Sequence, residues 1–405
     1  MSERTIGLLL GTEEDWPAAF EALVARLGDV DGQTLRTERI VNEPFDLRYK
    51  PRYHVVIDRL AWWYDLPRAW LKKVSLMDDV YLLNNPFTFQ AMEKHSAYCA
   101  LMRLGIRVPE TWLLPHKVPP ANERFEQTAA KYNAPFDLNA IADRIGYPLF
   151  MKPFDGGQWV GVSRIGTPAE LQQRYDESGT RLMHLQKALE GFEVFVRSLS
   201  IGAETMSMWF DPSRPMYDRY QVRHDFLTPA LGDEVITISR LVNAFFRWEF
   251  NSCETIVKDG VAYPIDYANA SPDVALTSLH YYFPWAITAL VRWTAFCAVT
   301  GRAMRVFQDS RLYFQWGDRD DLTYEDKLAK YREIADDYFQ VDEYREFCER
   351  HLAHLPEVAY AWFTSREFDD VLVQTVRDTF PAHEHERFVA HYRGLLELWA
   401  RDNEA

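Results

Sequence analysis

The sequence has few cysteines and no excess of positive charge. Its four cysteines lie far apart along the 405 residues, and no CxxC pair occurs. This argues against a cysteine-based zinc site and a disulfide framework, and a reducing, cytoplasmic environment fits best. The chain carries 60 acidic residues against 45 Lys and Arg, for a formal charge of −15. Nucleic acid is an unexpected partner, because a phosphate-backbone binder needs positive charge.

The sequence also lacks a hydrophobic run suited to a membrane. Its most apolar stretch, residues 283–299, is interrupted by Arg292, whereas a spanning helix needs about 20 predominantly apolar residues. The first ten residues have neither the basic segment nor the small-residue cleavage site of a signal peptide. We therefore expect a buried helix over 283–299 and no membrane partner.

Several common catalytic signatures are missing as well. No GxGxxG follows a predicted strand, and the motifs GxxxxGK[ST], HExxH and GxSxG do not occur. The sequence therefore lacks the signatures of four enzyme classes: nicotinamide-type Rossmann enzymes, P-loop NTPases, zincins and α/β-hydrolases. Cys253 lies beside Glu254, and a neighbouring carboxylate raises the pKa of a thiol. We expect Cys253 to be a packed, unreactive residue.

The composition supports a large folded core of more than one domain. Hydrophobic residues make up 47% of the chain and aromatic residues 15%, and a domain takes about 150 residues. Residues 1–88 alternate between short apolar runs and the three- and four-residue spacing of helices. The predicted elements there are strands at 5–11, 53–58 and 80–84 and helices at 14–27 and 67–76. This order predicts a small α/β domain.

The rest of the chain changes character twice. A helix is predicted over 88–104, followed by a polar connection at 116–137 and by short strands from 148 to 264. After Asp273 the pattern is helical to the end of the sequence. We expect residues 301–405 to form a helical region, and the sequence leaves open whether it mediates a homodimer or covers a substrate.

Residues 147–162 combine a lysine with a glycine-rich loop. The pattern predicts a strand containing Lys152, a loop with Gly156, Gly157 and Gly161, and a return strand. Backbone N–H groups of such a loop can close over phosphate oxygens, and an ammonium on the strand can neutralise them. Ordinary glycine hairpins look similar, so this segment alone leaves both interpretations open.

Residues 247–273 are predicted to form a hairpin that gathers oxygen ligands. Its strands join through Asp259 and Gly260, which would bring Glu254 near Asp266 and Asn269. Carboxylate and amide oxygens suit Mg²⁺ or Mn²⁺. Ordinary edge-strand polar residues are the alternative, but three of them in an apolar hairpin cost stability unless they serve a function.

The order of these segments resembles the ATP-grasp superfamily, particularly carboxylate–amine ligases related to D-alanine–D-alanine ligase, glutathione synthetase and the ribosomal-protein glutamate ligases. The resemblance covers about residues 84–290 and rests on Glu93-Lys94 with residues 104–111, the Lys152 loop, residues 182–194 and the acidic hairpin. It implies an α/β (α+β) protein. The implied parts are a pre-ATP-grasp domain at 1–88, an ATP-grasp domain at 89–300 and a helical C-terminal extension at 301–405.

The resemblance also implies roles for individual residues. Two lysines and the loop would bind the phosphates of ATP, the segment 186–188 would meet the adenine edge, and a glutamate would hold the ribose. These residues are Lys94, Lys152, Gly156, Gly157, Gln158, Gln186, Lys187, Ala188 and Glu193. Glu254, Asp266 and Asn269 would hold two Mg²⁺ ions, or Mn²⁺, between the phosphates.

The chain departs from the family pattern in two places. Relatives end the metal hairpin with Glu-x-Asn, whereas Asp266 and Asn269 stand one residue further apart. Asp266 would then need a β-bulge or an altered register to act as a ligand. The loop also carries the bulky pair Gln158-Trp159, which would enlarge a lid over the nucleotide.

Three arginines are candidates for contacts with anions. The basic residue that faces the triphosphate in relatives has no clear equivalent, and Arg219 and Arg223 are candidates. Arg223 and Arg247 are predicted as catalytic residues that hold a substrate carboxylate or the reaction intermediate, since a guanidinium matches that geometry with two hydrogen bonds.

The resemblance implies an ATP-dependent ligase that joins a carboxylate to an amine. The acid would form an acyl phosphate with ATP, and the amine would then displace phosphate, with no protein nucleophile. The substrates would be small-molecule or peptide acids and amines. Two alternatives remain open: a kinase of the same fold that acts on a small molecule, and a non-catalytic nucleotide-binding protein.

Overall fold

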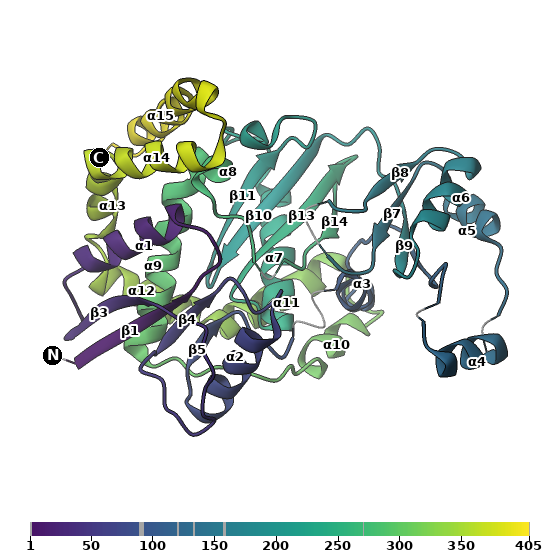
Figure 1. Cartoon of the computed structure of the whole chain (residues 1–405), viewed down its shortest axis with the longest axis horizontal. Coiled ribbons are helices and arrows are strands. Elements are labelled where there is room, and N and C mark those ends of the chain that lie inside the picture. Colours follow the sequence, from purple (N-terminus) through teal and green to yellow (C-terminus); the bar gives the residue numbers. More distant parts are fainter. Residues whose placement is uncertain are drawn as a thin grey trace.

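The computed structural model describes residues 2–88, 93–119, 121–132, 134–156, 159–269 and 271–404. The chain forms three β-sheets flanked by helices (Figure 1). The mixed α/β fold predicted from the sequence is therefore confirmed. Gly157 and Gln158 lie outside the described residues.

The first sheet belongs to the N-terminal α/β region and has the order β2-β3-β1-β4-β5. Its elements are β1 (Ser2–Leu9), α1 (Asp15–Arg26), β2 (Asp29–Val30), β3 (Gln33–Arg39), β4 (Val55–Asp58), α2 (Asp65–Met77) and β5 (Tyr81–Leu83). Strands β3, β1, β4 and β5 are parallel, so their carboxyl ends share one edge. The sequence analysis missed β3, because only Leu35 of this strand is buried.

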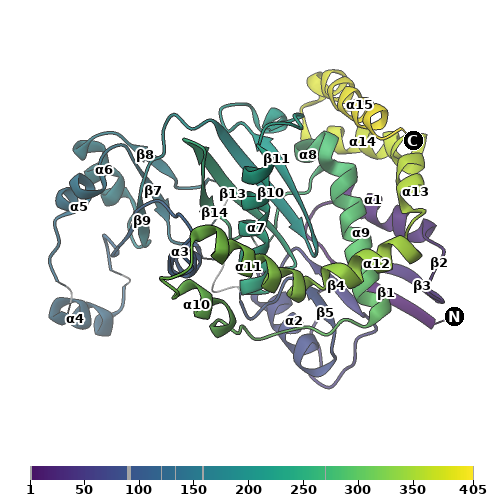
Figure 2. The same ribbon diagram turned by 180° about the vertical axis from the view of Figure 1, so that it is seen from behind.

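The central sheet is antiparallel, with the order β12-β11-β10-β13-β14. Its strands are β10 (Val194–Ile201), β11 (Glu204–Phe210), β12 (Tyr220–Gln221), β13 (Phe250–Lys258) and β14 (Val261–Asp266). Helix α7 (Pro229–Phe246) packs on one face of this sheet. Helix α11 (Tyr324–Phe339) packs in turn on α7 (Figure 2). The other face has no helix in front of it in Figure 1. Short strands recur through 148–264 as expected, but two helices that the sequence analysis missed, residues 168–177 and α7, also lie in this range.

The third sheet has the order β6-β9-β7-β8 and its own hydrophobic core. Its strands are β6 (Thr111–Leu114), β7 (Leu149–Pro153), β8 (Ser163–Ile165) and β9 (Met183–Lys187). The neighbouring helices are α4 (Glu123–Tyr132), α5 (Leu138–Ile145) and α6 (Pro168–Glu177). Helix α3 (Lys94–Arg103) lies between this sheet and the central one (Figure 1). A separate core suits a unit that closes over a ligand.

Helix α9 (Phe283–Thr300) is the main core helix. One helical stretch, Leu276–Thr300, is long and apolar enough to cross a membrane by composition alone, but 83% of its most apolar window is buried inside the protein. This confirms the expected buried helix. At Gly202, whose φ is +53°, a Cβ atom would lie 1.9 Å from the Trp293 ring of α9. Only glycine allows this close approach.

The C-terminal region is helical, as expected. The remaining elements are η2 (Met216–Asp218), α8 (Leu276–Leu279), η3 (His280–Tyr282), α9 (Phe283–Thr300), α10 (Arg311–Gly317), α12 (Val341–His351), α13 (Leu355–Phe363), α14 (Arg366–Thr379), η4 (Ala382–Glu384) and α15 (His385–Asp402). Helices α13 and α14 contact α1 of the N-terminal domain, and α15 contacts η3. These helices therefore brace the N-terminal domain against the central sheet.

Candidate functional site

Two carboxylates face each other across the β13–β14 hairpin. Glu254 is opposite Asp266, whereas the next pair is Thr255 with Pro264, so Ile265 is an extra residue on β14. The extra residue turns the Asp266 side chain to the same face as Glu254. The register is therefore altered next to Asp266, as its wide spacing from Asn269 led us to expect.

Asn269 is held close to this pair by neighbours of Glu254. Its backbone N–H donates to Asn251 Oδ1 at 2.8 Å, and its side-chain amide donates to Ser252 Oγ at 3.2 Å. Glu254, Asp266 and Asn269 thus lie together at one end of the hairpin. They form one cluster of oxygen atoms, as the sequence predicted.

Lys94 lies directly on this cluster. Its Nζ is 2.8 Å from Asp266 Oδ2 and donates to the Gly156 carbonyl at 3.1 Å. Burial opposes the charge of Lys94, but the attraction of Asp266 and Glu254 is stronger, and the pKa is raised. Lys94 is therefore a protonated link between the glycine loop and the carboxylates.

Lys152 completes the cluster from the side of the small sheet. Its Nζ donates to Gln186 Oε1 at 2.7 Å and to the Ile265 carbonyl at 3.4 Å. Burial lowers the pKa of Lys152 to about 8, and the nearby Lys94 lowers it further, although both carboxylates oppose the shift. Because Lys152 has no direct ion pair among the described residues, an anion bound there would restore its charge.

Arg197 is a third cation at the site, and the sequence analysis missed it. On β10, Arg197 stands opposite Glu254, with Nη1 3.3 Å from Glu254 Oε1. Burial raises the pKa of Glu254 while Arg197 lowers it. The signal was a single arginine within the apolar run of residues 194–201. The site thus has three cations and two carboxylates.

One segment expected to contact the nucleotide base, residues 186–188, begins beside Lys152. The side-chain amide of Gln186 donates to Thr111 Oγ1 at 2.8 Å, which fixes Gln186 beside Lys152. The backbone N–H groups of Lys187 and Ala188 donate to the carbonyls of Glu110 and Pro148. The Lys187 side chain is exposed. The adenine contact of residues 186–188 stays a prediction.

Glu193 lies apart from the lysine cluster. Its carboxylate accepts a hydrogen bond from the backbone N–H of Asp259 at 2.8 Å, in the turn of the β13–β14 hairpin. The side chain is exposed. This contact gives Glu193 a structural role in capping the turn, and its ribose contact stays a prediction.

The glycine loop runs beside Lys94. Gly156 has a φ of +96° and Gly161 of +77°, a conformation that favours glycine. Trp159 and Val160 expose their side chains at the tip. The described part of the loop therefore combines a contact to Lys94 at Gly156 with two exposed apolar side chains.

The two arginines predicted as catalytic lie away from the cluster. Arg247 is buried, donates to the Ala244 carbonyl at 2.6 Å, and stacks on the Tyr338 ring at 4.4 Å. The structure corrects the expectation for Arg247, which packs against the C-terminal helices. Arg223 is exposed and stacks on Trp209 at 4.2 Å.

Arg219 lies closer to the site than Arg223 does. The guanidinium carbons of Arg197 and Arg219 lie 5.4 Å and 6.0 Å from the centre of the same ring, that of Phe210. Phe210 and Arg197 are on the same open face of the central sheet, because Arg197 stands opposite Met208, two residues before Phe210. Arg219 thus extends the positive charge of that face.

Two further residues at the site were not predicted. The Tyr98 hydroxyl donates to the Ile265 carbonyl at 2.8 Å, which ties α3 to the bulge. His184 stands opposite Lys152 in the β7–β9 ladder and stacks on His95. Burial, with His95 and the two lysines nearby, lowers the pKa of His184 to about 3. An uncharged histidine therefore packs beside the lysines.

The cluster suits a metal ion only in the presence of further ligands. Among the described residues there is no group of three or more His, Cys, Asp or Glu side chains able to hold a metal. Two carboxylates and one amide offer hard oxygens, and a nucleotide would supply the remaining ones. Cys253 is buried, and burial raises the pKa of its thiol to about 12. This fits the expected unreactive residue.

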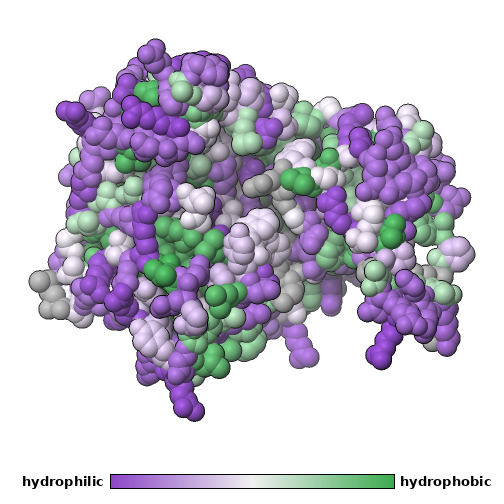
Figure 3. Space-filling model, in the orientation of Figure 1, coloured by the Kyte–Doolittle hydropathy of each residue, from purple (hydrophilic) through white to green (hydrophobic). Residues whose placement is uncertain are grey.

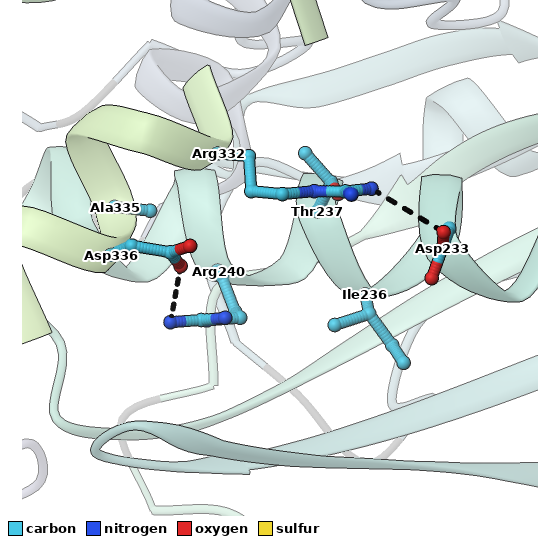
Figure 4. Close-up of a pocket in the computed structure, with 7 residues that line it drawn as sticks. All are labelled: Asp233, Ile236, Thr237, Arg240, Arg332, Ala335 and Asp336. Atoms are coloured by element: carbon cyan, nitrogen blue, oxygen red, sulfur yellow. Dashed lines mark hydrogen bonds and ion pairs between the residues drawn. The ribbon is translucent and has the colours of Figure 1, made fainter. Parts of the chain in front are cut away.

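A cavity elsewhere in the fold is a weaker candidate. It has a volume of about 180 Å³ and lies between α7 and α11, on the helix-covered side of the central sheet (Figure 4). Arg240 is 2.6 Å from Asp336, and Arg332 is 3.8 Å from Asp233. Because both guanidinium groups already face carboxylates, the cavity offers little net charge to a ligand.

The chain is similar to known proteins in part of its sequence and in its fold. No family model matches the chain. D-alanine–D-alanine ligase B from Xanthomonas campestris pv. campestris is 31% identical over 163 residues, which are 36% of this chain and 47% of that protein. The D-alanine–D-alanine ligase of Xanthomonas axonopodis pv. citri matches to the same extent. The chain thus matches about half the length of these relatives.

A solved structure covers more of the chain. The D-alanine–D-alanine ligase of Bacillus anthracis, complexed with ATP, aligns with a TM-score of 0.50 and 15% identity over 74% of this chain and 99% of that chain. The two proteins share a fold. The predicted resemblance in fold to ATP-grasp proteins is therefore confirmed.

Proposed function

We propose that this chain, which has the ATP-grasp fold, is an ATP-dependent ligase that joins a carboxylate to an amine and releases ADP and phosphate. The observation that carries the proposal is the cluster of Lys94, Lys152 and Arg197 around Glu254 and Asp266. This set of charges suits a polyphosphate with its metal ions, and it lies between two sheets with separate cores.

ATP and Mg²⁺ fit the residues present. Lys152 has a lowered pKa and no ion-pair partner among the described residues, so a phosphate oxygen would supply the missing negative charge. Glu254, Asp266 and Asn269 would hold the metal, and Lys94 would hold a phosphate. A bound Mg²⁺ would offset negative charge on the phosphoryl group during transfer.

The chain would accelerate the reaction by positioning and charge neutralisation. The oxygen of the substrate carboxylate attacks the γ-phosphorus of ATP, and ADP leaves. The amine then attacks the carbonyl carbon of the acyl phosphate, phosphate leaves, and the nitrogen loses a proton. Lys152, Lys94 and Arg197 would offset the charge that builds up on the transferred group. No side-chain nucleophile is needed.

Water must be kept away from the activated acid. An acyl phosphate hydrolyses if water reaches it, so a closed site is required. The apolar loop tip at Trp159 and Val160 is suited to cover the reaction. The separate core of the small sheet would let that sheet and the loop move together.

The test is ADP and phosphate release from ATP and Mg²⁺ in the presence of pooled carboxylic acids and amines. We expect release to require both an acid and an amine, and to be lost in Glu254→Gln. A variant of an exposed residue outside the site, Val118→Ser, serves as the matched control. Release with an alcohol alone and a stable phosphorylated product would instead identify a kinase, and ATP binding without turnover a binding protein.

A further inference from the structure

The N-terminal α/β region exposes several large aromatic and apolar side chains. Tyr49, Trp63, Tyr64 and Leu66 expose 64%, 55%, 60% and 48% of their surface. Together with the half-buried Tyr53 and Trp70 they are called here the aromatic strip. In Figure 3, green hydrophobic residues lie among purple ones on the lower part of this face, where β5 and α2 lie in Figure 1, and on this scale Tyr and Trp are drawn near white to pale purple.

Part of the strip lies on one face of α2 (Asp65–Met77). Leu66, Trp70 and Lys73 follow the four- and three-residue spacing that places residues on one face of a helix. The Tyr53 ring packs on Trp70 with ring centres 6.1 Å apart, and Lys73 Nζ donates to the Tyr49 carbonyl. The segment 49–53 therefore lies along α2.

The segment that carries Tyr49 and Tyr53 is a long loop. Residues 40–54, between β3 and β4, contain no helix or strand. Loops longer than about 12–15 residues without secondary structure are uncommon in compact domains, and many of them are functional.

The strip joins the reaction site through the end of β4. Arg59 directly follows this strand, and Trp63 is four residues further on. The Arg59 guanidinium donates to the Pro272 carbonyl at 2.7 Å, three residues after Asn269. Arg59 also pairs with Glu13 at 2.9 Å. A ligand lying on the strip would thus reach the segment that follows the metal hairpin.

Exposed charges of both signs lie around the strip, with Asp65 between Tyr64 and Leu66 and two cations beside Tyr49. Arg48 and Lys50 flank Tyr49 and are exposed, and among the described residues neither has an ion-pair partner. The full chain carries −15. Tyr, Trp and Arg are enriched in binding surfaces relative to the rest of a protein surface. A second copy of this acidic chain is a poorer match than an acidic segment.

We propose that the aromatic strip binds a peptide segment with acidic and apolar side chains that supplies the reacting carboxylate. The inference rests on the proposed ligase function and names its substrate class. The apolar side chains of the peptide pack on Trp63 and Tyr64, and its carboxylates face Arg48 and Lys50. Its reacting carboxylate is then directed past Arg59 to the cluster around Glu254.

Binding is measured first, by fluorescence anisotropy with the full chain. The probe is a fluorescein-labelled peptide of alternating Glu and Phe, and a peptide of alternating Lys and Phe is the charge control. We expect the acidic peptide to bind, with at least about a tenfold loss of affinity in Trp63→Ser combined with Tyr64→Ser. Arg48→Glu with Lys50→Glu should weaken it similarly, whereas Val118→Ser should not.

Two results overturn the inference. One is an acidic peptide that fails to bind or binds equally well to the double aromatic variant. The other is a wild-type dimer in light scattering that the same variant converts to a monomer, which would make the strip a contact between copies.

ATP calorimetry on the same proteins separates the two proposals. If the wild type binds ATP with Mg²⁺ but not the peptide, this inference fails and the proposed function stands. If ATP does not bind, the proposed function fails. In turnover, the double aromatic variant should raise the KM for the peptide and leave ATP affinity unchanged, whereas an equal loss of both would contradict docking on the strip.

Discussion

At the residue scale, the site depends on lysines whose charge depends on their partners. Lys94 has Asp266 within 2.8 Å and is protonated, whereas Lys152 contacts only neutral oxygens among the described residues and has a pKa of about 8. The two lysines look alike in the sequence. Their different surroundings mean that ATP binding should change the protonation of Lys152 alone.

ATP affinity should therefore fall as pH rises through about 8. Below that pH Lys152 is charged before ATP arrives, and above it binding must take up a proton, which costs up to about tenfold in affinity per pH unit. Calorimetry at pH 7 and pH 9 measures the change. Lys152→Arg keeps its charge at both values, so an equal pH dependence in that variant would contradict the assignment to Lys152.

Replacing Arg197 should reduce catalysis more than replacing Arg223, which the sequence analysis predicted to be catalytic. Arg197→Ala leaves Glu254 without its nearest cation and removes a positive charge from the proposed phosphate site. We expect kcat/KM for ATP to fall by about 10²–10³-fold, the usual cost of losing such a group. Arg223→Ala, on an exposed residue over Trp209, is the control and should change little.

The sequence predicted the site residues that belong to local motifs. It missed residues that reach the site only through the pairing of distant strands. Lys94, Lys152, Glu254, Asp266 and Asn269 come together as expected. Arg197 was missed because its partner is 57 residues away and becomes a neighbour only through the β10–β13 ladder. Arg247 was wrongly predicted to be at the site, because the sequence around it does not indicate that its side chain is buried against Tyr338.

At the element scale, the bulge on β14 is the feature that assembles the site. The extra residue Ile265 presents its carbonyl to both Tyr98 of α3 and Lys152 of β7. The unusual spacing after Asp266 predicted this irregularity. Helix α7 was missed because its run of Val235, Ile236, Thr237 and Ile238 has the composition of a strand.

Removing the Tyr98 hydroxyl tests this link. Tyr98→Phe keeps the buried ring but loses the 2.8 Å hydrogen bond to the Ile265 carbonyl. The free energy of unfolding should fall by about 1 kcal/mol, as expected for one buried hydrogen bond. Denaturant unfolding measures it, with Tyr64→Phe on the surface as the matched control. An unchanged midpoint for Tyr98→Phe would show that the bulge is held by other contacts.

At the scale of the whole molecule, the C-terminal helices stabilise the central sheet. Glu249 precedes β13 and is fully buried, and it accepts a hydrogen bond from Tyr338 of α11. Arg302 lies nearby and donates to Tyr81 of β5 at 2.8 Å. Burial raises the pKa of Glu249, with Arg302 opposing the shift. One buried polar cluster therefore connects all three parts of the chain.

Breaking the buried polar cluster around Glu249 should lower the stability of the folded protein. Tyr338→Phe removes a donor from a buried carboxylate, which we expect to lower the free energy of unfolding by about 1–3 kcal/mol. The thermal midpoint measures the loss, and Tyr360→Phe on α13 is the comparison. A loss in Tyr338→Phe no larger than in the control would mean that the C-terminal helices are held on by apolar packing alone.

The most direct test of the central claim is calorimetric titration of the chain with ATP, in Mg²⁺ and in EDTA. The account predicts binding that is strong with Mg²⁺, weak without it, and lost in both Lys152→Met and Glu254→Gln, with folding of the variants confirmed by circular dichroism. Binding that is absent in the wild type, or that survives unchanged in both variants, would contradict the account.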